Sequence, residues 1–154
     1  MISSKDKEAL IYLRKDARMT LSKLSRATKT PVSTLFNRIK KQEENFVKKF
    51  TVLLDYRKIG YLARAYVVMK VHRKDKEELR LFLHRHKNVN SLYKVNHDYD
   101  FLTDVVFKDY VELDGFLEEL QNDFAVKIGF VHHVIENIKE EHFFSEPNKA
   151  EVYW

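Results

Sequence analysis

Residues 31–44 carry polar side chains of the kinds that hydrogen-bond to DNA, at spacings that place several of them on one side of a helix. Asn can pair with adenine and Arg with guanine, while hydroxyl groups bind base edges or phosphates. The candidates for base contacts are Ser33, Thr34, Asn37, Arg38 and Lys41. The candidates for phosphate contacts, which position a protein without reading sequence, are Arg26, Lys29, Lys40, Lys48 and Lys49. The pattern indicates binding to double-stranded DNA, with a three-helix bundle that has an incidental basic face as the alternative.

Three short segments with apolar residues at helical spacing are expected to position these side chains: residues 4–18, 20–27 and 31–44. Thr20 and Thr30 are expected to cap the second and third helices, with Pro31 in the first turn of the third. The third helix is expected to turn four apolar side chains inward, namely Val32, Leu35, Phe36 and Ile39. Because the second helix of such a pair enters the major groove, residues 1–47 predict a helix-turn-helix DNA-binding domain.

The charge of the chain is uneven along its length. Residues 1–58 contain 15 Lys and Arg against 6 Asp and Glu, whereas residues 59–154 contain 13 against 17. This asymmetry suggests two modules with different partners. A basic module attracts phosphate backbones, although a solvated basic face without a partner has the same composition.

The remainder of the chain predicts a second, mixed domain. Residues 46–54 are rich in β-forming residues and predict a strand, so that residues 48–60 become a strand and linker. Residues 61–141 follow the order β-α-β-β-α-β, which is the ferredoxin-like pattern. The fold class is therefore α+β, with the helix-turn-helix domain joined to the ferredoxin-like domain by a strand linker. The open face of such a sheet needs a cover, so a homodimer is expected.

Residues 142–154 form a tail that is rich in aromatic residues. Free tails are normally polar. The tail is therefore expected to dock against the same or a neighbouring subunit through Phe143, Phe144, Tyr153 and Trp154.

Taken together, residues 5–140 resemble the Lrp/AsnC family, the leucine-responsive regulatory protein family. Residues 6–18 (DKEALIYLRKDAR) look like the family's opening helix, and residues 31–44 (PVSTLFNRIKKQEE) stand where it has its recognition helix. Residues 95–109 (VNHDYDFLTDVVFKD) are similar to the family's Gly-Asp-Tyr-Asp turn and the strand after it. The resemblance implies a winged-helix-like DNA-binding domain in a sequence-specific transcriptional regulator.

The resemblance also implies that the C-terminal domain dimerises through its sheet and assembles into larger rings, commonly octamers. It implies an amino-acid effector near the turn, where Asp98, Tyr99 and Asp100 match the family's motif. A carboxylate is a suitable partner for an α-ammonium group. The alternative is that the two Asp residues only shape a β-turn.

Three glycines of the family pattern are replaced in this chain. Lys29 stands in the turn before the third helix, Asn45 stands before the linker strand, and His97 opens the motif of residues 97–100. A non-glycine residue at positive φ is costly, so a reshaped turn is expected at Lys29.

Several classes of protein are excluded or disfavoured by composition. The chain contains no Cys, so disulfides, zinc-thiolate sites and cysteine nucleophiles are excluded. The seven His residues lack metal-ligand spacing, no catalytic motif is recognised, and no cofactor is expected. Residues 1–15 do not form a signal peptide and no apolar stretch spans a membrane, so a cytoplasmic protein is expected. The rival functions are a nonspecific, chromatin-like DNA-binding assembly protein without effector, and an enzyme with a convergent site in the ferredoxin-like half.

Overall fold

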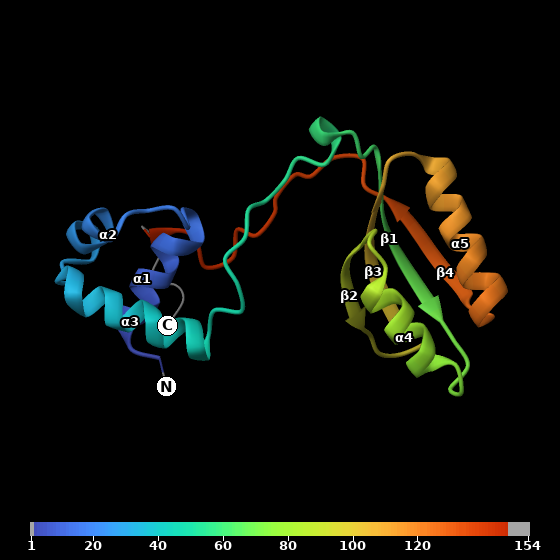
Figure 1. Ribbon diagram of the computed structural model, residues 1–154, viewed down its shortest axis with the longest axis horizontal. Helices are drawn as coiled ribbons and strands as arrows, with labels where there is room; N and C mark the ends of the chain where they lie inside the picture. The colour runs from blue at the N-terminus through green and yellow to red at the C-terminus, as the bar shows by residue number, and fades with distance from the viewer. Residues whose placement is uncertain (1, 148–154) are drawn as a thin grey trace. The chain divides into compact units, whose positions relative to one another are not determined.

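The computed structural model describes residues 2–147, and the chain divides into two compact units (Figure 1). Unit 1 combines Met1–Leu53 with Ile138–Trp154, and unit 2 is Leu54–Asn137. Unit 1 therefore takes in a C-terminal segment that the sequence assigns to the second domain and the tail.

The helices of unit 1 are α1 (Ser4–Lys15), α2 (Leu21–Thr28) and α3 (Val32–Asn45). The predicted cap at Thr20 is confirmed, since its side chain accepts the backbone N–H of Lys23. The predicted cap at Thr30 is wrong. Its hydroxyl donates to the Thr28 carbonyl instead, and Pro31 precedes α3 without any side-chain cap. No strand follows α3 among the described residues of unit 1, so the winged form implied by the resemblance is not seen there.

The core of unit 1 is small. Ala9, Leu24 and Leu35 are fully buried, one from each helix. Partly buried side chains surround them, namely Tyr12, Leu13, Met19, Leu21 and Ile39. Two residues expected to face inward lie outside instead: Val32 is 42% exposed and Phe36 is 57% exposed. Three short helices cover only a narrow stripe of α3, and at about 100° per residue Phe36 lies well away from Leu35.

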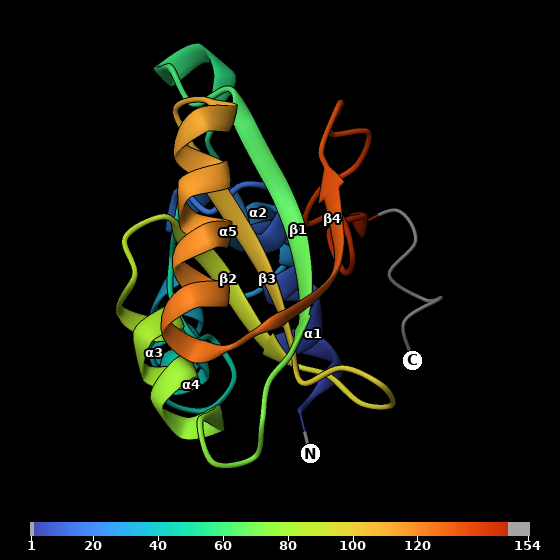
Figure 2. The ribbon, with the colours of Figure 1, turned by 90° about the vertical axis from the view of Figure 1, so that its right-hand side faces the viewer.

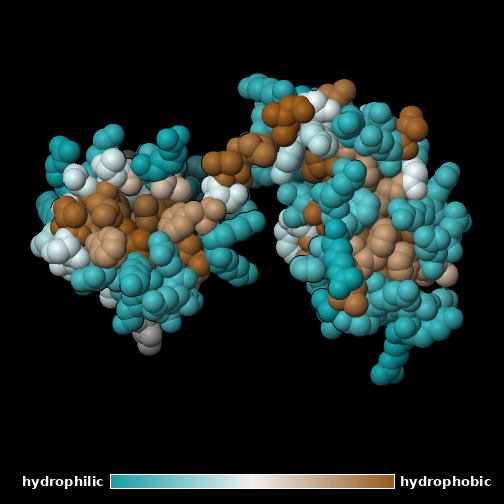
Figure 3. Space-filling model, viewed as in Figure 1, coloured by the Kyte–Doolittle hydropathy of each residue, from teal (hydrophilic) through white to brown (hydrophobic). Residues whose placement is uncertain are grey.

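The predicted strand at residues 46–54 is wrong for the single chain. The structure gives these residues an irregular, exposed course that ends at the short helix η1 (Arg57–Ile59). A strand needs a hydrogen-bonding neighbour, and no pairing for this segment exists in the part of the chain that the structure describes. Its apolar side chains are largely exposed, from 48% at Leu54 to 69% at Val52, and Figure 3 colours this connection as hydrophobic.

Unit 2 contains β1 (Ala63–Lys70), α4 (Lys76–Arg85), β2 (Val89–Lys94), β3 (Phe101–Phe107), α5 (Tyr110–Phe124) and β4 (Lys127–His133). The four strands are antiparallel in the order β2-β3-β1-β4. The predicted α+β class and β-α-β-β-α-β order are confirmed. Both helices lie on the same face of the sheet (Figure 2).

Strict alternation along β1 separates the two faces of the sheet. Ala63, Ala65, Val67 and Met69 are fully buried, and they pack against Leu79, Leu83, Leu113, Phe116 and Leu120 of the helices. The intervening residues of β1 point to the opposite, open face. There Arg64 makes a two-pronged pair with Asp104 of β3, with both N···O distances 2.9 Å. These side chains are only 13% and 4% exposed, and the Asn90 amide also donates to Asp104 at 2.7 Å.

No helix in residues 2–147 is long and apolar enough to cross a membrane. No group of three or more metal-binding side chains converges within the same range.

Candidate nucleic-acid interface

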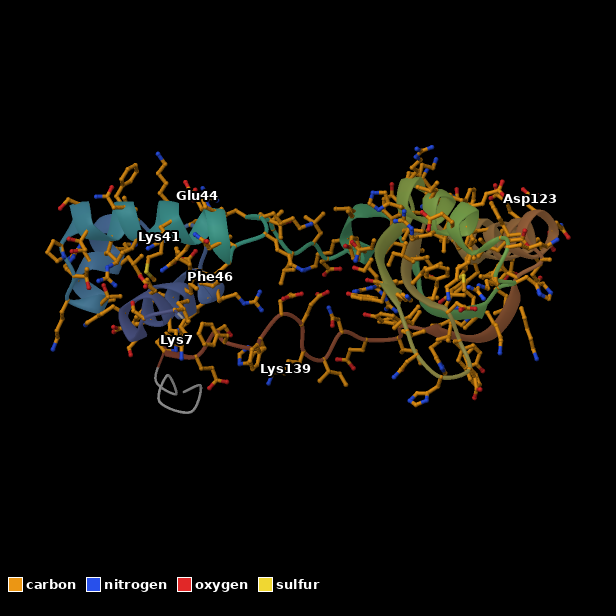
Figure 4. All side chains as sticks on the ribbon, turned by 90° about the horizontal axis from the view of Figure 1, so that it is seen from below. Lys7, Lys41, Glu44, Phe46, Asp123 and Lys139 are labelled. Carbon is orange, nitrogen blue, oxygen red and sulfur yellow. The ribbon has the colours of Figure 1, made fainter. Side chains whose placement is uncertain are left out.

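The exposed side of α3 carries a row of polar side chains. Ser33, Asn37 and Lys40 stand at i, i+4 and i+7, so they line one side of the helix opposite the buried Leu35. Thr34 and Lys41 flank this row, and all five side chains are exposed. Figure 4 shows α3 with Lys41 and Glu44 labelled near its C-terminal end. The helix thus presents hydroxyl, amide and ammonium groups together on one accessible surface.

Arg38 lies on another side of α3 and is engaged within the unit. Its Nη1 is 3.1 Å from Asp6 Oδ1 and 3.3 Å from Ser3 Oγ, at the start of α1. Partial burial raises the pKa of Asp6, but the Ser3 hydrogen bond and the Arg38 charge outweigh it and lower that pKa. The Arg38 side chain is 35% exposed. It holds α1 and α3 together, which the sequence-based prediction of a guanine contact did not anticipate.

The turn between α2 and α3 keeps a left-handed residue although it lacks glycine. Lys29 has φ +50°, so the expected reshaping of this turn is wrong. Two hydrogen bonds fix the conformation. The Ser25 hydroxyl donates to the Thr30 carbonyl at 2.6 Å, and the Thr30 backbone N–H donates to the Ser25 carbonyl at 3.1 Å. The Lys5 ammonium also donates to the Thr28 carbonyl. The strain at Lys29 is therefore held by its neighbours, and its side chain, like that of Arg26, remains exposed beside α3.

The C-terminal segment contacts α1 through backbone carbonyls and the Glu141 carboxylate. The prediction that the Phe143 ring docks is wrong, because that side chain is 78% exposed. Arg14 donates to the Phe143 carbonyl through Nε and Nη2, and Nη2 also reaches the Glu141 carboxylate at 2.9 Å. Ile11, one turn before Arg14, is fully buried although it does not belong to the three-helix cluster. The predicted contacts of Tyr153 and Trp154 lie outside the described residues.

The turn of residues 97–100 is held largely by internal contacts. Asp100 accepts the Val71 backbone N–H at 3.0 Å and pairs with the Lys76 ammonium. The Lys76 hydrogen bond, followed by that from Val71, lowers the pKa of Asp100. His97 has φ +62°, the conformation for which the family's glycine is suited. Asp98 is the motif carboxylate that remains exposed.

Tyr99, the third motif residue, packs onto β4. A Cβ atom added to Gly129 would lie 2.2 Å from the Tyr99 ring, so only glycine leaves room for this contact. The Tyr99 ring also packs edge-on against the Phe130 ring, with 5.9 Å between the two ring centroids. Tyr99 therefore joins the turn to the sheet, a role that sequence reasoning missed. The signal for it was Gly129 in the middle of a strand pattern.

Comparison with protein families and sequences gives a consistent result. A family model described as the Lrp/AsnC ligand binding domain matches residues 64–142. An HTH-type transcriptional regulator of Pyrococcus abyssi is 30% identical over 148 residues, covering 96% of this chain and 100% of that protein. The HTH-type transcriptional regulator FL11 of Pyrococcus horikoshii is 30% identical over 114 residues, covering 73% and 76%.

Solved structures share the fold at low sequence identity. Bacillus subtilis LrpC has a TM-score of 0.82 at 17% identity, covering 90% of this chain and 98% of that one. A Neisseria meningitidis transcriptional regulator solved with L-Met has a TM-score of 0.80 at 19% identity, covering 91% and 94%.

Proposed function

Because the chain belongs to the Lrp/AsnC family of transcriptional regulators, we propose that it is a sequence-specific DNA-binding regulator whose helix α3 enters the major groove. The observation that carries the proposal is the exposed row of Ser33, Asn37 and Lys40 on the second helix of a helix-turn-helix pair. Asn37 is the residue best suited to a base edge, since an amide pairs with adenine through two hydrogen bonds. Lys40, Lys41, Arg26 and Lys29 supply phosphate contacts, which set the register.

Arg38 positions α3 in this proposal and does not contact a base. Its guanidinium is engaged by Asp6 and Ser3, so α3 keeps its angle to α1 through Arg38. The base-reading role expected from its residue type passes to Asn37 and Ser33.

We further propose that the protein acts as a homodimer through the open face of its sheet. Tyr93 and Phe130 are half exposed there, on a face that α4 and α5 leave uncovered. Large aromatic side chains exposed on an uncovered sheet face are typical of a surface that a second copy covers. A symmetric dimer presents two α3 helices, so the operator is expected to be a pseudo-palindrome with half-sites about one helical turn apart or a multiple of it.

The test compares two variants on one operator, first selected by the wild-type protein from a randomised duplex library. Asn37→Ala is expected to lose about 1–3 kcal/mol of binding free energy and to relax specificity at one base of each half-site. Gln121→Ala, at an exposed position of α5, is the matched control and is expected to bind as the wild type does. If Asn37→Ala kept wild-type affinity and specificity, α3 would not be the reading helix.

The nonspecific, chromatin-like alternative makes a different prediction. It requires similar affinity for any duplex together with a steep dependence on salt, since phosphate contacts alone would carry the binding. Selection from the random library would then enrich no common sequence.

We also propose that an amino acid modulates the protein at the turn of residues 97–100. The support is the family match and the exposed Asp98 carboxylate, which suits an α-ammonium group. Asp100 serves the turn itself through Lys76 and Val71. A panel of amino acids, screened by thermal shift, is expected to stabilise the wild-type protein and not Asp98→Asn. No stabilisation by any amino acid, or equal stabilisation of both proteins, would refute this site.

A further inference from the structure

Two large apolar side chains stand exposed on α3 beside the polar row. Phe36 is 57% exposed and Val32 is 42% exposed, although another side of α3 buries Leu35 and Gln42 and partly buries Ile39. Neither residue belongs to the core cluster of unit 1. An exposed Phe forgoes the free energy of burial, so this placement calls for a partner that covers the ring.

The position of the two residues connects them with the DNA-reading surface. Val32 and Phe36 are one turn apart, within the first two turns of α3, where a recognition helix contacts base edges. At about 100° per residue, Phe36 lies roughly 60° from Ser33 and roughly 40° from Lys40 around the helix. A duplex that meets the polar row therefore also meets the Phe36 ring.

The chemistry of the major groove offers one apolar group, the C5-methyl of thymine. Apolar side chains, Phe among them, recognise thymine through contact with this methyl group. The lysines at positions 40 and 41 complement the phosphates on either side, and this complementarity favours DNA over an apolar protein surface as the partner.

We propose that Phe36, with Val32 beside it, is a specificity-determining residue that reads thymine methyl groups in each half-site. The inference rests on the proposed function, because it requires that α3 enter the major groove. It goes beyond that function in naming the base and the atom that are read, and it predicts thymine at a defined position of each half-site.

The test removes the methyl group without changing any hydrogen bond. In the operator selected by the wild-type protein, each thymine is replaced by uracil one at a time, and the affinities are measured by fluorescence anisotropy. At one or two positions in each half-site, the wild-type protein is expected to lose about fourfold in affinity per methyl group. Phe36→Ala is expected to bind thymine and uracil duplexes equally. Leu81→Ala, an exposed apolar residue on α4, is the matched control and is expected to discriminate as the wild type does.

The outcomes distinguish thymine recognition by Phe36 from sequence-specific DNA binding as such. A defined operator whose uracil versions bind wild-type protein unchanged would overturn the reading of thymine and leave the proposed function standing. Failure to select any operator would refute sequence-specific binding itself. If Phe36→Ala retained discrimination but changed the oligomeric state in light scattering, the ring would belong to a protein contact, and the proposal would be overturned.

Discussion

The two units of the chain differ in how they hold themselves together. Unit 2 encloses a large apolar cluster between its sheet and two helices, whereas unit 1 has only three fully buried residues in its three-helix cluster. Ion pairs and hydrogen bonds supplement that small core. Arg38 pairs with Asp6 and so joins α3 to α1, and Arg14 hydrogen-bonds to Phe143 and so joins α1 to the C-terminal segment. A small helical unit leaves most of its side chains exposed, which suits a DNA-reading surface. The sheet unit buries one face of its sheet against α4 and α5 and leaves the other face uncovered.

The buried pair of unit 2 gives the largest expected effect. Asp104→Ala removes the carboxylate that the largely buried Arg64 guanidinium contacts at 2.9 Å, and the expected loss is about 3–5 kcal/mol in the stability of unit 2. Hydrogen exchange resolved by residue should show faster exchange in β1 and β3, with α1 and α3 unchanged. Equal destabilisation of unit 1 would show that the two units unfold together.

A core substitution in unit 1 tests whether that unit unfolds independently of unit 2. Leu35→Ala removes one of the three buried residues of its cluster, and the expected loss is about 2–5 kcal/mol. Because the core is small, unit 1 should unfold well before unit 2, giving two transitions in thermal unfolding followed by circular dichroism. A single cooperative transition would contradict the separation of the units.

The turn between α2 and α3 offers a stabilising change. Lys29 is strained at φ +50°, and Lys29→Gly removes that strain at some cost in unfolded-state entropy. The net gain is expected to be roughly 0.5–1 kcal/mol for unit 1. Chemical denaturation should show a higher midpoint, and Lys23→Gly, within α2, is the control that should lower it. DNA affinity should fall slightly, since Lys29 is also a phosphate contact in the proposed interface.

The pH response of unit 2 should be smaller still. The Lys76 hydrogen bond lowers the pKa of Asp100 in the folded protein, so its contribution is present at neutral pH and is lost as pH falls below the ordinary range of Asp. Asp100→Asn should flatten this part of the stability curve of unit 2. An unchanged acid limb in the variant would show that Asp100 contributes nothing to it.

The sequence predicted unit 2 more accurately than unit 1, for a physical reason. The alternation along β1 and the helical spacing of α4 and α5 report burial directly, because a large core imposes a strict pattern. In unit 1 the core is too narrow to impose one, so Val32 and Phe36 were predicted to face inward. Residue type alone could not distinguish Arg38, turned to Asp6, from Asn37, turned to solvent. The segment of residues 46–54 has strand propensity, but a strand requires a partner that the single chain does not supply.

Sequence-specific reading by α3 is tested most directly by the equilibrium affinity of the wild-type protein for its selected operator and for a scrambled duplex of equal length, at about 150 mM salt. Specific reading predicts a preference on the order of 10³ or more for the operator. Equal affinities that fall together as salt rises would contradict it, because α3 would then hold DNA by its phosphates alone.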